Sequence, residues 1–286
     1  MAIVLDNITY TYGMGTPFQK TALHGVSLTI NNGEFLGIIG HTGSGKSTFV
    51  QHLNGLLHPT TGTVTVNGVD ISASTEEAKR MRHKVGMVFQ YPEHQLFEET
   101  IAQDIAFGPK NLGFSEQEVD ERVRDAMKFV GLDYDTYAER SPFHLSGGQM
   151  RRVAIAGVVA MDPDFLVLDE PSAGLDPFGR EEIFEEIIRL HKEKGITVIL
   201  VSHNMEDISR MASRLVVLDK GRIILDGAPM DIFNDHRDEL QAIGVDVPPV
   251  SVTMEYLRSR GLDVSNRVLF VDDAVAAIME GGSHVK

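Results

Sequence analysis

The most chemically specific stretch of the sequence is GHTGSGKST, at residues 40–48. Its first eight residues fit the pattern G-x-x-x-x-G-K-[ST] in full, between an apolar run and a helix-like segment. The glycines let the backbone curl so that its N–H groups face phosphate oxygens. Lys46 then reaches the β- and γ-phosphates, and the Ser47 hydroxyl binds Mg²⁺. The pattern predicts a nucleoside triphosphate site made by Gly40, His41, Thr42, Gly43, Ser44, Gly45, Lys46, Ser47 and Thr48.

Two adjacent carboxylates follow the apolar run FLVL, at Asp169 and Glu170. A carboxylate at a strand end can hold Mg²⁺ directly or through water, which is the role we predict for Asp169. Glu170 is then free to orient or deprotonate an attacking water. The alternative is a turn or helix-capping pair, because DEP also resembles the exit from a strand.

Three further side chains are candidates for the same site. Gln90 ends KVGMVFQ and can reach a metal or water with its amide, although an isolated glutamine is more often an ordinary loop residue. His203 ends TVILVSH, where a γ-phosphate contact competes with a purely structural hydrogen bond. Tyr12 could stack on an adenine, or could simply belong to the core.

A second glycine-rich turn, LSGGQ at residues 145–149, precedes the helical run MRRVAIAGVVAM. Ser146 can cap this helix, and free N–H groups at a helix N-terminus bind anions. We therefore expect a second phosphate-binding turn, formed by Ser146, Gly147, Gly148 and Gln149.

The elements that must position these residues are short runs that are apolar throughout: FLGIIG, KVGMVFQ, DFLVLDE and TVILVSH. Such runs are typical of strands buried on both faces, as in a parallel sheet covered by helices. Ligands of these sheets bind at the carboxyl ends of the strands. The candidates that fall at these ends are Gly40, Gln90, Asp169, Glu170 and His203.

Other segments predict an antiparallel part and a helical part. IVLDNITYTY and ALHGVSLTI alternate in the manner of half-buried strands, and TVTVNGVDI reads as a hairpin with a turn at Asn67-Gly68. Residues of about 91–160 read as helical, and Ser115 with Glu118 predicts a capping box.

The caps of a later helix and the end of the core can also be read. Asp176 and Pro177 suit the start of a helix and Gly195 its end. RLVVLDKGRIILDG predicts a hairpin, after which we place a boundary near residue 228. Residues 229–286 carry mixed helix and strand signals and no catalytic pattern.

Composition excludes several classes of protein. The 286 residues are 42% hydrophobic and 23% charged, as in ordinary globular proteins, and the absence of cysteine excludes disulfides and thiolate chemistry. A net charge of −15 argues against nucleic-acid binding. The basic run KRMRHK, at 79–84, is interpreted as a solvated helix face, with a contact patch as the alternative. The sequence shows no signal peptide and no apolar run long enough to span a membrane.

Together these residues resemble the ATP-binding cassette (ABC) family over about residues 3–228. GHTGSGKST looks like its Walker A motif, Gln90 its Q-loop, LSGGQ its signature, FLVLDE its Walker B, SAGLD its D-loop and His203 its switch histidine. The resemblance implies ATP and Mg²⁺ as cofactors and catalytic roles for Glu170, His203 and Gln90. It also implies metal binding by Ser47, Gln90 and Asp169, and adenine stacking on Tyr12.

The implied fold is α/β: a P-loop NTPase ABC cassette at 1–228 with a mostly parallel sheet core. It includes an antiparallel β subdomain and a helical signature subdomain at about 91–160. A small α+β C-terminal extension, at 229–286, is a candidate for dimerisation. ABC cassettes pair head to tail, which would bring each P-loop to the opposite LSGGQ and explain the two phosphate-binding turns. The second ATPase subunit could be a copy or a paralogue.

Within the family, YPEHQLFEETIAQDIAFGPKNLG and RVAIAGVVAMDP resemble the ATPases of energy-coupling factor (ECF) transporters, the second of their two types. Gly157 stands where many other ABC ATPases have arginine. The implied partners are a transmembrane scaffold protein and a substrate-binding membrane protein. The implied function is ATP-driven uptake of vitamins or transition-metal ions, from a peripheral position on the cytoplasmic face of the cell membrane.

The segment YPEHQLFEE, at 91–99, directly follows Gln90 and is the predicted docking site for a helix of the membrane partner. The alternative is that Leu96 and Phe97 only anchor the helical subdomain. For the whole chain, the alternatives are another ABC importer or exporter, or a non-transport ABC ATPase acting in DNA maintenance, in translation or as a nucleotide switch.

Overall fold

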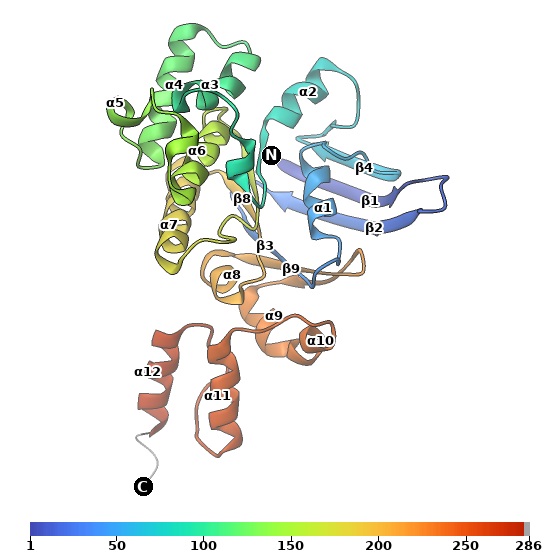
Figure 1. Cartoon of the computed structure of the whole chain (residues 1–286). Coiled ribbons are helices and arrows are strands. Elements are labelled where there is room, and N and C mark those ends of the chain that lie inside the picture. Colours follow the sequence, from blue (N-terminus) through green and yellow to red (C-terminus); the bar gives the residue numbers. More distant parts are fainter. Residues whose placement is uncertain (283–286) are drawn as a thin grey trace.

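The computed structural model describes residues 1–282, and its centre is a six-stranded sheet of order β10-β9-β3-β8-β7-β6 (Figure 1). All neighbours are parallel except β9 and β10, which form a hairpin. The strands are β3 (Phe35–Ile39), β6 (Val85–Val88), β7 (Phe165–Asp169), β8 (Thr197–Val201), β9 (Arg214–Asp219) and β10 (Arg222–Gly227). The predicted parallel core and the hairpin at its edge are confirmed.

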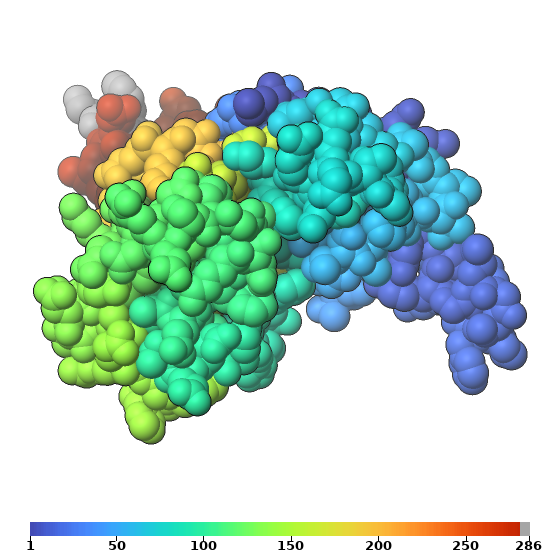
Figure 2. Space-filling view, turned by 90° about the horizontal axis from the view of Figure 1, so that it is seen from above, coloured from blue at the N-terminus to red at the C-terminus, as the bar shows by residue number. Residues whose placement is uncertain are grey.

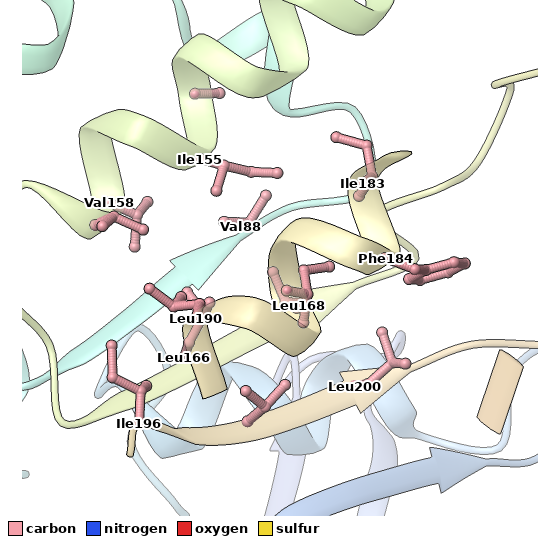
Figure 3. Packing of buried hydrophobic residues seen from close by; sticks show 14 of the residues in the cluster. Val88, Ile155, Val158, Leu166, Leu168, Ile183, Phe184, Leu190, Ile196 and Leu200 are labelled. Atoms are coloured by element: carbon pink, nitrogen blue, oxygen red, sulfur yellow. The ribbon is translucent and has the colours of Figure 1, made fainter. Parts of the chain in front are cut away.

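Strands β3, β6, β7 and β8 are buried on both faces because successive side chains enter different clusters. One cluster takes Leu166, Leu168 and Leu200, and the other takes Val167, Ile199 and Val201. In Figure 3, α6 and α7 cover the face that carries the first cluster. The helices that flank the sheet in sequence are α1 (Lys46–Leu53), α7 (Pro177–Lys194) and α8 (Met205–Met211). This is why these strands are apolar throughout rather than alternating.

A separate four-stranded antiparallel sheet has the order β2-β1-β4-β5 and packs on the other face with α1. Its strands are β1 (Ala2–Tyr12), β2 (Lys20–Asn31), β4 (Thr61–Val66) and β5 (Val69–Asp70), and α2 (Glu76–His83) follows. Asn67 and Gly68, at φ 52° and 82°, make the predicted hairpin turn.

The helical subdomain lies beside the sheets and, in the space-filling view of Figure 2, projects at the end opposite the β1–β2 hairpin. It contains η1 (Pro92–Gln95), α3 (Ile101–Asn111), α4 (Glu116–Phe129), α5 (Tyr134–Tyr137), η2 (Pro142–His144) and α6 (Gly147–Val159). The capping box of Ser115 and Glu118 is present, as expected. None of the helices within residues 1–282 has the length and apolar character needed to cross a membrane.

The C-terminal extension corrects one expectation: within the described residues it is helical and contains no strand. Its helices are α9 (Pro229–Asp235), α10 (Arg237–Ala242), α11 (Pro249–Ser259) and α12 (Val271–Gly282). The apolar run RVLFV forms no strand; Val268 and Leu269 are buried in irregular backbone, and the Val268 N–H donates to the Asn266 carbonyl oxygen at 3.0 Å. The first half of the extension also belongs to the main core, because Ile232, Phe233 and Leu240 are buried there. Only the second half has a small cluster of its own, around Met254.

This packing predicts that α9 stabilises the whole domain. Phe233 is 0% exposed in the main core, so we expect Phe233→Ala to lower the free energy of unfolding by about 3–5 kcal/mol. Tyr256→Ala, at a side chain that is 56% exposed on α11, should change it by less than about 0.5 kcal/mol. Chemical denaturation followed by circular dichroism measures both. Equal effects of the two substitutions would mean that the extension is energetically separate from the core.

Candidate active site

The phosphate-binding loop connects β3 to α1 and depends on glycine at two positions. Gly40 has φ 153°, and a Cβ there would lie 2.3 Å from the Leu218 carbonyl oxygen. Gly45 has φ 108° and forms the N-cap of α1. Only a residue without a side chain fits both, so the loop can curl tightly against the β9–β10 hairpin and turn its N–H groups to an anion at the helix N-terminus.

Lys46 already lies across this loop. Its Nζ donates to the carbonyl oxygens of Gly40, at 2.6 Å, and His41, at 3.1 Å. Burial lowers the pKa of the Lys46 ammonium, and the carboxylates of Glu170 and Asp169 act in the opposite direction. The lysine is therefore held at the mouth of the loop, next to the carboxylates at the end of β7.

Asp169 and Ser47 form a pair of oxygen ligands beside Lys46. Burial raises the pKa of Asp169, which is 8% exposed, while its hydrogen bond with Ser47 and the charge of Lys46 lower it. A buried carboxylate hydrogen-bonded to a hydroxyl is a donor set that suits Mg²⁺. The two residues thus fit the predicted metal, and binding of a cation would offset the cost of burying the Asp169 charge.

Glu170 and His203 meet at the ends of β7 and β8. His203 Nδ1 donates to Glu170 Oε1 at 2.7 Å, and the Glu170 N–H donates to the Val201 carbonyl oxygen at 3.0 Å. Glu170 has φ 53°, a left-handed conformation that is uncommon for a residue with a side chain. Such strain at a strand end is typical of functional sites. The carboxylate can accept a proton from water while the histidine orients it.

The remaining candidates differ in how far the geometry supports them. The Tyr12 hydroxyl hydrogen-bonds Thr48 Oγ1 at 3.1 Å, so the ring borders the loop, and it is 42% exposed. Tyr12 and Tyr10 form a T-shaped pair with ring centroids 4.8 Å apart, and stacking of Tyr12 on a base stays a prediction. Gln90 follows β6 at the same edge of the sheet and is exposed. Its role also stays a prediction.

The LSGGQ turn lies in the helical subdomain, where Ser146 caps α6. Ser146 Oγ accepts the Gln149 N–H at 3.3 Å, and Gln149 Oε1 accepts the Ser146 N–H at 3.1 Å. Gly147 is exposed at the first turn of the helix. Within residues 1–282 no hydrogen bond or ion pair joins this turn to the phosphate-binding loop. The two predicted phosphate-binding turns of one chain are therefore not in polar contact with each other in the described residues.

One residue next to the loop escaped the sequence-based prediction. Asp219, the last residue of β9, has its Oδ1 3.0 Å from His41 Nε2, and His41 Nδ1 lies 2.8 Å from the Thr42 carbonyl oxygen. This contact holds His41, one of the unspecified positions of the G-x-x-x-x-G-K-[ST] pattern, against the neighbouring strand β9. The signal was available, because Asp219 ends an apolar strand in the same way as Asp169.

Comparison with known proteins gives one consistent family. The family model described as ABC transporter matches residues 23–173. The chain is 52% identical over 280 residues to the energy-coupling factor transporter ATP-binding protein EcfA2 of Clostridium tetani, covering 98% of this chain and 97% of the relative. It is 53% identical over 279 residues to EcfA2 of Clostridium acetobutylicum, covering 98% and 97%.

Solved structures agree with this. The chain superposes on cbiO1 of Clostridium perfringens, described as part of the ABC transporter complex cbiONQ, with a TM-score of 0.73 and 36% identity, covering 88% of this chain and 98% of that one. It also superposes on a dimeric ATP-binding cassette in a post-hydrolysis state with ADP and phosphate, with a TM-score of 0.70 and 31% identity, covering 79% and 98%.

Proposed function

The chain belongs to the ABC transporter family as an ATP-hydrolysing subunit of the energy-coupling factor type, and from this premise we propose how it works. It powers the uptake of a vitamin or a transition-metal ion through a membrane scaffold protein and a substrate-binding membrane protein, from a peripheral position on the cytoplasmic face. The observation that carries the proposal is the Glu170–His203 pair at the same sheet edge as Lys46 and Asp169.

Nucleotide binding rests on the loop between β3 and α1. Its N–H groups and Lys46 hold the phosphates once Lys46 leaves the carbonyl groups of Gly40 and His41. Ser47 and Asp169 are the residues that would hold Mg²⁺, with Gln90 completing the set. When bound, Mg²⁺ neutralises charge on the β- and γ-phosphate oxygens.

Hydrolysis then needs a base and a group that stabilises charge. Glu170 accepts the proton of the attacking water, and His203 orients Glu170 through the 2.7 Å hydrogen bond and faces the γ-phosphate. Glu170 also interacts electrostatically with Lys46 of the phosphate-binding loop, which ties the proposed base to the nucleotide site.

ABC cassettes of this type act as ATPase dimers with membrane partners. We propose the head-to-tail arrangement, in which the exposed LSGGQ turn of one subunit closes on the nucleotide in the phosphate-binding loop of the other. The partner is a copy or a paralogue. Residues 1–228 form the catalytic cassette in this proposal, and the extension adds contacts between the subunits.

The docking site is proposed at a groove of about 360 Å³ between the 91–99 segment, α3 and α6. Two neighbouring apolar residues of the segment have different surroundings. Leu96 is 8% exposed and anchors the subdomain. Phe97 is 56% exposed and forms a T-shaped pair with Phe107, with ring centroids 4.8 Å apart. Asp104 fixes this geometry by accepting the N–H groups of Phe97 and Glu98 at 3.2 and 3.0 Å. An exposed aromatic pair beside a groove suits an apolar helix.

Phe97→Asp is expected to abolish co-purification with the membrane scaffold and to stop uptake, because it places a charge in an apolar contact. ATP affinity and thermal stability of the isolated ATPase should stay near the wild-type values, since the side chain is exposed. Phe18→Asp, the same change at an 88% exposed residue of the β1–β2 turn, is the control and should keep the complex. If Phe97→Asp co-purifies as well as wild type, the docking site lies elsewhere.

A further inference from the structure

Arg151, on α6 just beyond the LSGGQ turn, joins two functional segments from a buried position. Its side chain is 3% exposed. Nη1 donates to the carbonyl oxygen of Pro171 at 2.9 Å, and Nη2 donates to the carboxylate of Glu93 at 3.2 and 3.4 Å. Pro171 directly follows Glu170, and Glu93 lies in η1, inside the 91–99 docking segment. One guanidinium thus contacts both the residue next to the proposed base and the proposed docking site.

Stability alone does not explain this arrangement. A buried ion pair is costly to desolvate, and Arg151 Nε is buried with no hydrogen-bond partner among the described residues. The two contacts also require arginine, because the planar guanidinium offers donors in two directions at once, whereas a lysine ammonium is a single point charge.

The adjoining arginine shows that the feature is specific to position 151. Arg152 instead pairs with Glu182 on α7. Its hydrogen bonds reach neither Glu93 nor Pro171 in the described part of the chain. The two neighbours therefore form a matched pair, in which one arginine bridges the functional segments and the other links two helices.

We propose that Arg151 is a positioning residue that transmits the state of the docking segment to Glu170 and so makes the hydrolysis rate depend on the membrane partner. A shift of η1 moves Glu93, and the guanidinium passes this shift to the Pro171 carbonyl. Glu170 is one peptide bond away and has little backbone freedom at φ 53°. The inference rests on the proposed function, because it needs a partner that docks at 91–99.

The test uses the full membrane complex and the isolated ATPase dimer in parallel. For Arg151→Lys we expect the kcat of the complex to fall about 10- to 100-fold, because small displacements of a catalytic group have effects of this size. The KM for ATP should stay within about twofold of wild type, since the phosphate-binding loop is untouched. The ratio of kcat in the complex to kcat in the isolated dimer should fall to near one. Arg152→Lys should keep the wild-type ratio.

A second variant covers the case in which Arg151→Lys does not fold. Glu93→Gln changes only the charge of a partly exposed side chain, and it should lower the same ratio. Adding it to a folded Arg151→Lys should cause little further loss, since both act through one contact. A wild-type ratio in both single variants, with or without a lower melting temperature, would overturn the role of Arg151. A wild-type complex whose ATPase ignores its membrane partner would instead overturn the proposed function.

Discussion

Replacing Glu170 with glutamine is expected to lower kcat for ATP hydrolysis by about 10²–10⁴-fold, the usual contribution of a general base. The amide keeps the shape of the carboxylate and a carbonyl oxygen for the His203 hydrogen bond, but it cannot take the proton of the water. ATP affinity should change little, because the loop at 40–48 is not altered. ATP should then accumulate at the site and hold the dimer closed.

Two measurements check this expectation. Phosphate release gives kcat, and size-exclusion chromatography with ATP shows whether a dimer persists. Glu181→Gln, at a 47% exposed glutamate on α7 that pairs with Arg210, is the control and should hydrolyse ATP normally. Turnover of the Glu170→Gln variant near the wild-type rate would assign the base to another residue.

Mixing two inactive variants is expected to restore activity if LSGGQ works across the dimer. Lys46→Ala removes the charge that binds phosphate, and Ser146→Arg places a large cation in the signature turn. In a dimer that contains one of each, both lesions fall on one composite site and the other site is intact. With random pairing of equal amounts, about a quarter of the wild-type ATPase rate should return, because half of the dimers have one of two sites intact.

The activity of each variant alone sets the baseline, and the rate is measured before and after the mixture has exchanged subunits. The structure motivates this design, since Ser146 and Gly147 are exposed and, among residues 1–282, no hydrogen bond or ion pair joins the LSGGQ turn to the phosphate-binding loop. Full activity of Ser146→Arg by itself would show that nucleotide is held within one subunit.

Local sequence signals predicted the parts of the fold that depend on local chemistry. Asp176 caps α7 by accepting the Gly179 N–H at 2.7 Å, and Gly195 ends that helix with φ 65°. Strands buried on both faces are recognisable because every residue must be apolar. The motifs at strand ends predicted that Glu170 and His203 would lie at one edge of the sheet, and a 2.7 Å hydrogen bond joins their side chains.

Contacts between distant segments were beyond such signals. RVLFV is rich in β-branched and aromatic residues, but Val268 packs in the cluster around Met254 and Leu269 in the main core, and neither lies in a strand. Arg151 contacts Glu93 and Pro171, which lie 58 and 20 positions away in the sequence. No local sequence signal distinguishes Arg151 from its neighbour Arg152. Glu170 was likewise predicted from its residue type and its place at a strand end. Its left-handed backbone conformation was not predicted.

The position of Lys46 in the phosphate-binding loop bears on how fast the site empties after each turnover. Its ammonium donates to the carbonyl oxygens of Gly40 and His41, at 2.6 and 3.1 Å, and these acceptors are available to it when phosphate leaves. Departing ADP therefore does not leave this half-buried cation without partners, which would otherwise raise the barrier to dissociation. The same two carbonyls compete with incoming nucleotide for the ammonium. The ATPase of a transporter binds and releases nucleotide in every cycle, so a loop that pairs with its own lysine acts at both steps.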